Sequence, residues 1–259
     1  MATTARWRYA VPNAFTAASI VFAVLAIEAA IAGRVLASAW WALYGVLTDR
    51  LDGAAAKALK ASSEFGVQFD SLADLAIFGV APPAVWYSFY ARHPALGWST
   101  AAGRAALVAL CVAWTLATAI RLARFNVASA HGKVAHYVGT PSTMTAGIVG
   151  VAFLTALKYS DASWTAPELS DPWHLLGPAR LDFALPWMPL LLAVGAAGML
   201  SPLRVPKLGR LRSRALTVVL AVTVAIGYTA GLFHRLPEYM LAGGLVYLAA
   251  CVVFHLRTR

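Results

Sequence analysis

Long apolar stretches alternate with short polar breaks along most of the chain. A helix needs roughly 20 apolar residues to cross the hydrocarbon core of a bilayer, and each stretch is near that length. The pattern therefore predicts an all-α, polytopic integral membrane bundle with about eight transmembrane helices. The predicted spans are 11–31, 35 to about 52, 66–90, 101–123, 140–157, 183–200, 215–233 and 239–255. The pair Pro82-Pro83 predicts a kink in the third span, because proline removes a helix hydrogen bond.

The composition supports this class. The chain is 60% hydrophobic and 12% charged, whereas a soluble domain usually carries about 25% charged residues. Cys111 and Cys251 both lie within apolar stretches, which argues against a disulfide framework or a cysteine metal site. The formal charge is +10, but no basic and aromatic module accompanies it, so we expect membrane lipids and not nucleic acid as the partner of these charges.

The positive charges also predict an orientation. If both termini are cytoplasmic, most of the 21 Lys and Arg residues fall on the cytoplasmic side, as the positive-inside rule requires. The basic stretch 204–214 is then a loop that faces lipid headgroups. We expect an integral protein of a prokaryotic inner membrane, with the ends of the second and third spans facing the cytoplasm.

Four carboxylates stand at helical spacing in otherwise apolar sequence. Asp49 and Asp52 are three residues apart, and Asp70 and Asp74 are four apart, so each pair shares one helix face. Carboxylates at membrane depth are costly and persist mainly where they pair, line a wet cavity or bind an ion. Four converging carboxylates would repel one another unless cations lay among them. The pattern therefore predicts a metal site.

The residue types indicate which metal and ligand. Carboxylates are hard oxygen ligands that suit Mg²⁺ or Mn²⁺, and four of them can hold two divalent cations around a phosphoryl group. Gly53 and Gly66 leave the helix faces bare, and Lys57 can supply positive charge to a phosphate. These features favour a diphosphate substrate at a membrane surface.

Two other interpretations remain open at this point. The aspartates can be solvated helix ends, with Asp49–Arg50 and Asp52–Lys57 as ordinary ion pairs. A membrane transporter or metal-binding protein is the second alternative. A transport path would place acidic residues deeper in other spans, where Glu28 is the candidate.

The aspartates and glycines form one spaced motif: Asp49-x-x-Asp52-Gly53-x-x-Ala56-Lys57, eight residues, then Gly66-x-x-x-Asp70-x-x-x-Asp74. This motif resembles the signature of the CDP-alcohol phosphotransferase family, with Lys57 where the family has Arg. The resemblance implies an integral membrane enzyme that moves a phosphatidyl-type group from a CDP-linked donor to an alcohol and releases CMP.

Other stretches narrow the resemblance. Residues 78–82, 121–126, 139–142 and 201–204 resemble the membrane-embedded phosphatidylserine synthases of that family, although Ile77 and Thr140 depart from their pattern. The resemblance implies CDP-diacylglycerol and L-serine as substrates and a homodimer. Inositol phosphate or glycerol 3-phosphate remains an alternative acceptor, for which Arg121, Arg124 and Lys133 can form a basic pocket.

The resemblance also implies roles for single residues. Asp49, Asp52 and Asp70 would bind metal, and Asp74 would contact metal and act as the general base. The residues expected to contact the CDP-lipid are Asn13, Thr16, Asp49, Asp52, Gly53, Ala56, Lys57, Gly66 and Asp70. Those expected to contact the acceptor are Arg121, Arg124 and Asn126, although the two arginines can instead be positive-inside anchors.

The same reasoning divides the chain into three parts. Residues 1–10 are expected to be an interfacial segment, and 11–201 the catalytic membrane domain. Residues 202–259 are expected to form the basic loop and two C-terminal transmembrane helices.

Overall fold

The protein is a polytopic helical membrane protein. The computed structural model describes residues 3–61, 63–130, 136–161, 173, 175–177, 180–206 and 214–257. Its α-helices are α1 (Thr3–Ile31), α2 (Val35–Leu59), α3 (Glu64–Asp74), α4 (Ala81–Arg92), α5 (Ala101–Ala130), α6 (Ser142–Lys158), α7 (Leu190–Leu200), α8 (Arg214–Leu232) and α9 (Pro237–Arg257). A π-helical stretch, η1 (Leu75–Val80), joins α3 to α4, and 3₁₀ turns lie at η2 (Pro94–Leu96) and η4 (Asp182–Trp187).

Each predicted span coincides with a helical segment, so the predicted class is confirmed. Within the described residues, four helical segments are long and apolar enough to cross a bilayer: Trp7–Ile31, Glu64–Arg92, Ala101–Ser129 and Pro237–Arg257. The sixth predicted span begins as the η4 turn, and α7 starts only at Leu190, after Pro186 and Pro189. Lys133 and residues 207–213 of the predicted basic loop lie outside the described residues.

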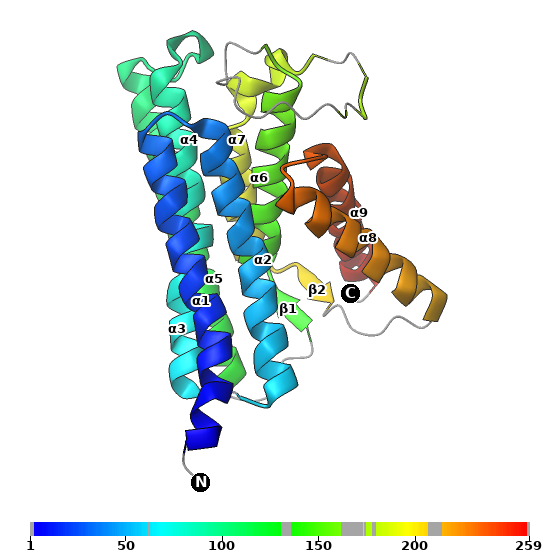
Figure 1. The fold of residues 1–259 in the computed structure, drawn as a ribbon. Coiled ribbons are helices and arrows are strands. Elements are labelled where there is room, and N and C mark those ends of the chain that lie inside the picture. Colours follow the sequence, from blue (N-terminus) through cyan, green and yellow to red (C-terminus); the bar gives the residue numbers. More distant parts are fainter. Residues whose placement is uncertain are drawn as a thin grey trace.

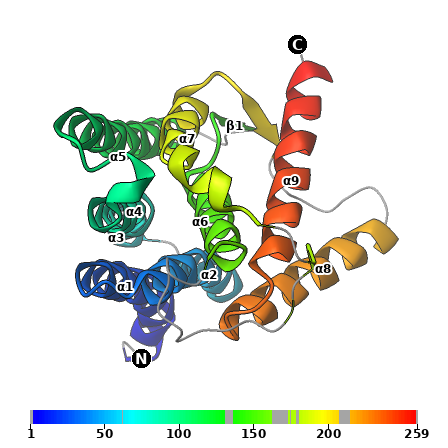
Figure 2. The same ribbon diagram turned by 90° about the horizontal axis from the view of Figure 1, so that it is seen from above.

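The helices from α1 to α7 run side by side in one bundle (Figure 1). Seen along the bundle in Figure 2, α8 and α9 lie at a steep angle to the other helices, with α9 beside α6 and α8 near α2. The C-terminal pair therefore flanks the bundle on the side of α2 and α6.

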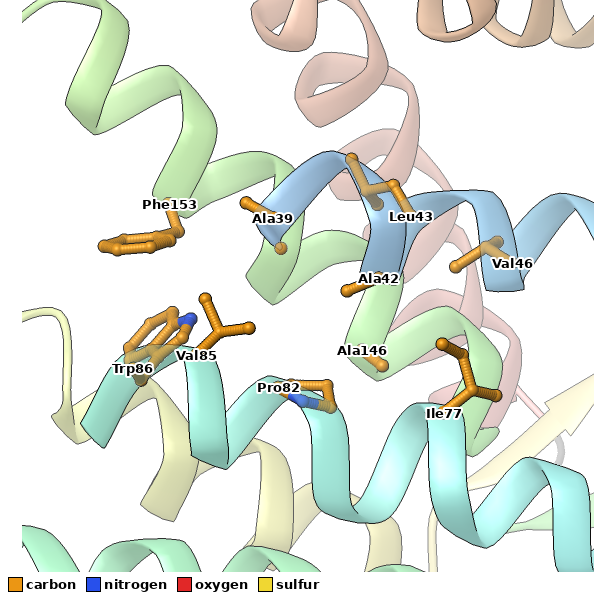
Figure 3. Close-up of a pocket in the computed structure, with 11 residues that line it drawn as sticks. Ala39, Ala42, Leu43, Val46, Ile77, Pro82, Val85, Trp86, Ala146 and Phe153 are labelled. Atoms are coloured by element: carbon orange, nitrogen blue, oxygen red, sulfur yellow. The ribbon is translucent and has the colours of Figure 1, made fainter. Parts of the chain in front are cut away.

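A glycine lets α2 approach η1 closely. A Cβ on Gly45 would lie 2.0 Å from Ile77 Cγ1, so only glycine permits this approach. Figure 3 shows the core beside this contact, where Ile77, Val85 and Trp86 meet apolar side chains of α2 and α6 around a cavity of about 20 Å³. The contact holds the second and third spans side by side, and these spans carry the four aspartates.

Pro82 and Pro83 leave two helix carbonyls without their backbone donors, and side chains of α5 donate to these carbonyls instead. Pro82 and Pro83 have no N–H, so the carbonyls four residues earlier, of Phe78 and Gly79, lose their helical donors. Trp114 Nε1 donates to the Phe78 carbonyl at 2.7 Å, and Thr115 Oγ1 donates to the Gly79 carbonyl at 2.8 Å. The third span is therefore π-helical just before the two prolines, and hydrogen bonds from α5 stabilise this stretch.

A short β-ribbon departs from the all-α prediction. The strand β1 (His136–Val138) pairs antiparallel with β2 (Arg204–Pro206), with Tyr137 opposite Val205. The next residue, Gly139, has φ +77°, and a Cβ there would lie 2.1 Å from the Met199 carbonyl oxygen. The ribbon ties the segment before α6 to the segment after α7.

Candidate active site

A tight turn between α2 and α3 brings the two halves of the aspartate motif together. Lys60 caps α2 in the left-handed region at φ 50°, and Ser63 caps the start of α3 by accepting a hydrogen bond from the Gly66 N–H at 3.0 Å. The chain then turns back, α3 packs against α1, and carboxylate oxygens of Asp49 and Asp74 come within 4.8 Å of each other.

Three of the four predicted metal ligands form an acidic cluster. Carboxylate oxygens of Asp49, Asp70 and Asp74 all lie within 4.8 Å of one another. Asp74 is only 9% exposed. Closely spaced, buried carboxylates repel one another, and hard oxygen donors of this kind match Mg²⁺ or Mn²⁺. The donor set therefore fits a divalent cation.

Asp52, the fourth predicted ligand, lies beside this cluster and faces α1. Thr16 Oγ1 donates a hydrogen bond to Asp52 Oδ2 at 2.9 Å, and both side chains are buried. A second buried contact, Ser19 Oγ to Thr48 Oγ1 at 2.7 Å, lies further along the same pair of helices. Polar side chains therefore join α1 to α2 next to the acidic cluster.

A polar pocket of about 120 Å³ opens between α1, α2 and α3. It is lined by most of the residues predicted to contact the CDP-lipid, namely Asn13, Thr16, Asp52, Gly53, Ala56, Gly66 and Asp70. A Cβ on Gly53 would meet nothing within 4 Å, so this glycine leaves open space at the pocket wall. Two predicted contacts do not line the pocket: Asp49 belongs to the acidic cluster, and Lys57 is exposed on α2.

The predicted acceptor residues separate into two groups. Arg121 is 8% exposed, its Nη1 donates to Ser142 Oγ at 2.7 Å, and its charge acts on Asp49 and Asp74. Asn126 is half-buried, and its Nδ2 donates to Ser71 Oγ at 2.8 Å. Arg124, in contrast, is exposed. The structure thus brings Arg121, and not Arg124, to the acidic cluster.

Three further residues border the site. Thr143 lies near the Asp49 carboxylate, Ser142 accepts a hydrogen bond from Arg121, and Ser63 lines the pocket. Ser63 followed by Glu64 is a helix-start signal that the sequence offered. Ser142 stands within the stretch 139–142, whereas nothing in the local sequence singles out Thr143.

Comparisons with known proteins agree with this site. The model of the family described as CDP-alcohol phosphatidyltransferase matches residues 9–194, which contain all the site residues described above. A Helicobacter pylori protein named CDP-diacylglycerol–serine O-phosphatidyltransferase is 35% identical over 151 residues, 58% of this chain and 60% of that protein.

Two further relatives carry the same name. The Mycobacterium tuberculosis protein is 35% identical over 170 residues, which are 62% of this chain and 55% of the relative. The Saccharomyces cerevisiae protein is 36% identical over 119 residues, 43% of this chain and 39% of the relative. The chain thus spans less than two thirds of the length of these curated relatives.

Proposed function

Because the chain belongs to the CDP-alcohol phosphatidyltransferase family, we propose that it transfers a phosphatidyl group from CDP-diacylglycerol to the hydroxyl of L-serine. The observation that carries the proposal is the polar pocket directly beside the acidic cluster, with Asp70 common to both. A nucleotide diphosphate in the pocket would present its phosphorus to the buried carboxylates.

The reaction needs one proton acceptor. The serine hydroxyl oxygen forms a bond to the lipid-bearing phosphorus, and the bond from this phosphorus to the oxygen that bridges to CMP breaks. CMP leaves with that electron pair, and the hydroxyl proton passes to Asp74. Asp74 suits this role because it is the most buried member of the acidic cluster, and a positioned carboxylate can take a proton as the oxygen attacks.

The proposal includes two divalent cations, Mg²⁺ or Mn²⁺. Asp49, Asp70 and Asp74 would hold them together with Asp52 on the adjoining wall. When bound, such cations neutralise charge on the phosphoryl oxygens and on the leaving group. Thr16 fixes the outer face of Asp52, since its hydroxyl donates to that carboxylate, and Thr143 lies near Asp49.

The donor nucleotide would occupy the polar pocket. Asn13 and Thr16 offer hydrogen-bonding groups from α1, and Gly53 lets a flat or phosphate-bearing group approach the backbone of α2. Lys57 lies one turn beyond Gly53 and is exposed, so it would meet a phosphate as a mobile point charge.

The acceptor would bind on the opposite side of the cluster, near Arg121. A buried guanidinium is a strong partner for the serine carboxylate, and its hydrogen bond to Ser142 fixes its direction. Since Arg124 is exposed, one buried arginine faces the cluster here, which suits a single carboxylate better than a phosphorylated acceptor.

Membrane placement and assembly complete the proposal. An orientation with the acidic cluster at the cytoplasmic face of a prokaryotic inner membrane lets a water-soluble acceptor meet a lipid-anchored donor. The homodimer implied by the family resemblance belongs to the proposal as well. Family membership favours a transferase over the transporter alternative.

The direct test is CMP release by the purified protein in lipid nanodiscs. CDP-diacylglycerol is supplied with L-serine, inositol phosphate or glycerol 3-phosphate, each with Mg²⁺ or Mn²⁺. We expect serine to stimulate CMP release and phosphatidylserine to form in equal amount. If a phosphorylated acceptor stimulates CMP release and serine does not, serine is excluded as the acceptor. If no alcohol stimulates CMP release, the proposed phosphatidyl transfer is excluded.

A further inference from the structure

A second, larger cavity lies outside the polar pocket. It has a volume of about 290 Å³ and is lined by residues of α2, α6, α8 and α9. This volume is near the lower end of the range for small-molecule sites, roughly 300 Å³. We call it the α8–α9 chamber. Two of its four walls come from helices beyond residue 194, where the family match ends.

The lining of the α8–α9 chamber is mostly apolar, and its charged residue, Arg50, stands at one end, which we call the polar end. Leu43, Ile148 and Met240 are among its apolar side chains. At the polar end, Arg50 and Thr143 belong to the same lining. The chamber therefore has one end suited to a charged headgroup and a body suited to hydrocarbon.

The polar end adjoins the acidic cluster. Arg50 follows Asp49 in the chain, and Thr143 lies near the Asp49 carboxylate. Tyr228 of α8 also lines the chamber and lies near Arg50 and Asp49. A ligand whose phosphate lies at the aspartates can therefore continue into the chamber.

The length of the α8–α9 chamber matches one leaflet of a bilayer. Along α2 it extends from Arg50 to Trp40, which is about 15 Å at a rise of about 1.5 Å per residue. Half of the hydrocarbon core is also about 15 Å. At the far end, His234 from the turn after α8 packs on Trp40 and hydrogen bonds to Tyr44 at 2.7 Å.

From these observations we propose that the α8–α9 chamber binds one acyl chain of the donor lipid, and that α8 and α9 set the chain length it accepts. The inference rests on the proposed function for the identity of the headgroup. The occupant is an acyl chain because the chamber is apolar, is about one leaflet deep and carries a cationic Arg50 where the lipid phosphate would lie.

An ion pair holds the chamber wall in place. Lys158 at the end of α6 and Glu238 at the start of α9 pair at 2.7 Å, with side chains 8% and 4% exposed, and Tyr159 donates to the same carboxylate at 2.9 Å. Breaking such a buried pair is costly, so α9 keeps its position relative to α6.

Substitutions at two glycines can test how the width of the chamber affects the lipid it accepts. A Cβ on Gly243 of α9 would meet nothing within 4 Å, and one on Gly227 of α8 would meet only ordinary contacts at 3.8 Å or more. Both glycines line the chamber. The first atom of a side chain therefore fits at either position without a clash, and the atoms beyond it would narrow the chamber.

The first experiment locates the chain. A CDP-diacylglycerol with a photoreactive diazirine near the end of one acyl chain is irradiated with the protein in nanodiscs, without serine, and the labelled residues are identified by mass spectrometry. We expect adducts on chamber residues such as Ile148 and Met240. Adducts confined to the exposed lipid-facing residues Val108 and Val112 of α5 would overturn the inference.

The second experiment measures chain-length preference. Gly243→Leu should raise the ratio of kcat/KM for octanoyl over oleoyl CDP-diacylglycerol roughly tenfold, because about two methylenes of the long chain are no longer buried. Ala242→Leu adds the same bulk on the same helix at an exposed position outside the chamber and should leave the ratio unchanged. Gly227→Leu repeats the test from α8. An unchanged ratio in both glycine variants would overturn the inference.

The two proposals fail in distinguishable ways. If labelling falls in the chamber but serine does not stimulate CMP release, the acyl site stands and the proposed acceptor fails. In the opposite case, serine stimulates CMP release, but no chamber residue is labelled and the glycine variants keep the wild-type chain-length preference. The proposed function then stands and the acyl site fails.

Discussion

Thr16 and Asp52 form a buried hydrogen bond between α1 and α2, in which Thr16 Oγ1 donates to Asp52 Oδ2 at 2.9 Å. The second oxygen of the Asp52 carboxylate takes no part in this bond, and Asp52 also lines the polar pocket. The position of a carboxylate next to a phosphate site thus depends on a hydroxyl from a different helix. Such supporting groups orient ligands without taking part in the chemistry.

The first prediction follows from this contact. Thr16→Val keeps the shape of the side chain but removes the donor, which costs about 1 kcal/mol for an ordinary hydrogen bond and more when the partner is charged. We expect KM for CDP-diacylglycerol to rise roughly 5–20-fold. Thr16→Ser keeps the hydroxyl and should stay close to the wild-type value. An equal loss in both variants would mean that packing, and not the hydrogen bond, matters at this position.

The second prediction concerns Asp74. Asp74→Asn removes the proposed proton acceptor while it preserves size, so turnover should fall by at least about 100-fold. Binding of CDP-diacylglycerol, measured by isothermal titration in the presence of Ca²⁺, should change much less. Asp70→Asn is the comparison, because Asp70 also lines the polar pocket and its loss should weaken binding as well. Wild-type turnover in Asp74→Asn would exclude this residue as the base.

The third prediction concerns metal removal. A chelator should abolish CMP release, and added Mg²⁺ or Mn²⁺ should restore it, because Asp49, Asp70 and Asp74 would otherwise face one another uncompensated. Titration of the metal-free protein with Mn²⁺, followed by electron paramagnetic resonance, gives a readout that does not depend on turnover. We expect two bound ions per chain in the wild type and fewer in Asp49→Asn. Full activity in the chelator would exclude the metal site.

The sequence was sufficient to predict the helices and the acidic cluster. The lengths of the apolar stretches determine the spans, and the spacing of Asp49 to Asp74 on two helices joined by a short turn brings their faces together. The sequence could not separate Asp52 from the other three, because its direction depends on Thr16, which is 36 residues earlier in the chain.

Contacts between distant residues explain the other departures. The exposure of Arg124 and the burial of Arg121 depend on how α5 is rotated in the bundle, which neither residue determines locally. Strands as short as β1 and β2 have no alternating pattern that a sequence could reveal, and their pairing depends on the approach of α6 and α7.

The fourth prediction uses this pair of arginines. Arg121→Ala should raise KM for serine at least about tenfold, because a charge-assisted hydrogen bond to the serine carboxylate is lost near the cluster. Arg124→Ala removes the same charge three residues away at an exposed position and should leave KM for serine within about twofold. KM for CDP-diacylglycerol should change little in either variant. Equal effects of the two substitutions on serine would favour their alternative role as membrane anchors.

The fifth prediction concerns the π-helical stretch that precedes α4. Trp114 is fully buried, and its Nε1 supplies the Phe78 carbonyl with the donor that Pro82 lacks. Trp114→Phe keeps an aromatic ring but leaves this carbonyl without the donor, so we expect a loss of about 1–3 kcal/mol in the free energy of unfolding. At roughly 2–4 °C per kcal/mol, the Tm in detergent should fall by several degrees. Trp187→Phe is the matched control, because Trp187 is 69% exposed.

A double variant separates the hydrogen bond from the loss of packing volume. Pro82→Ala returns an N–H to the helix, which can bond to a carbonyl one turn earlier. The Tm of Trp114→Phe combined with Pro82→Ala should therefore exceed the value expected from adding the two single effects. Simple additivity would show that Trp114 stabilises the bundle through packing alone, including its close contact with Gly195 of α7. In that case the Phe78 carbonyl must tolerate the missing donor, and the π-helical stretch would owe its stability to the surrounding core.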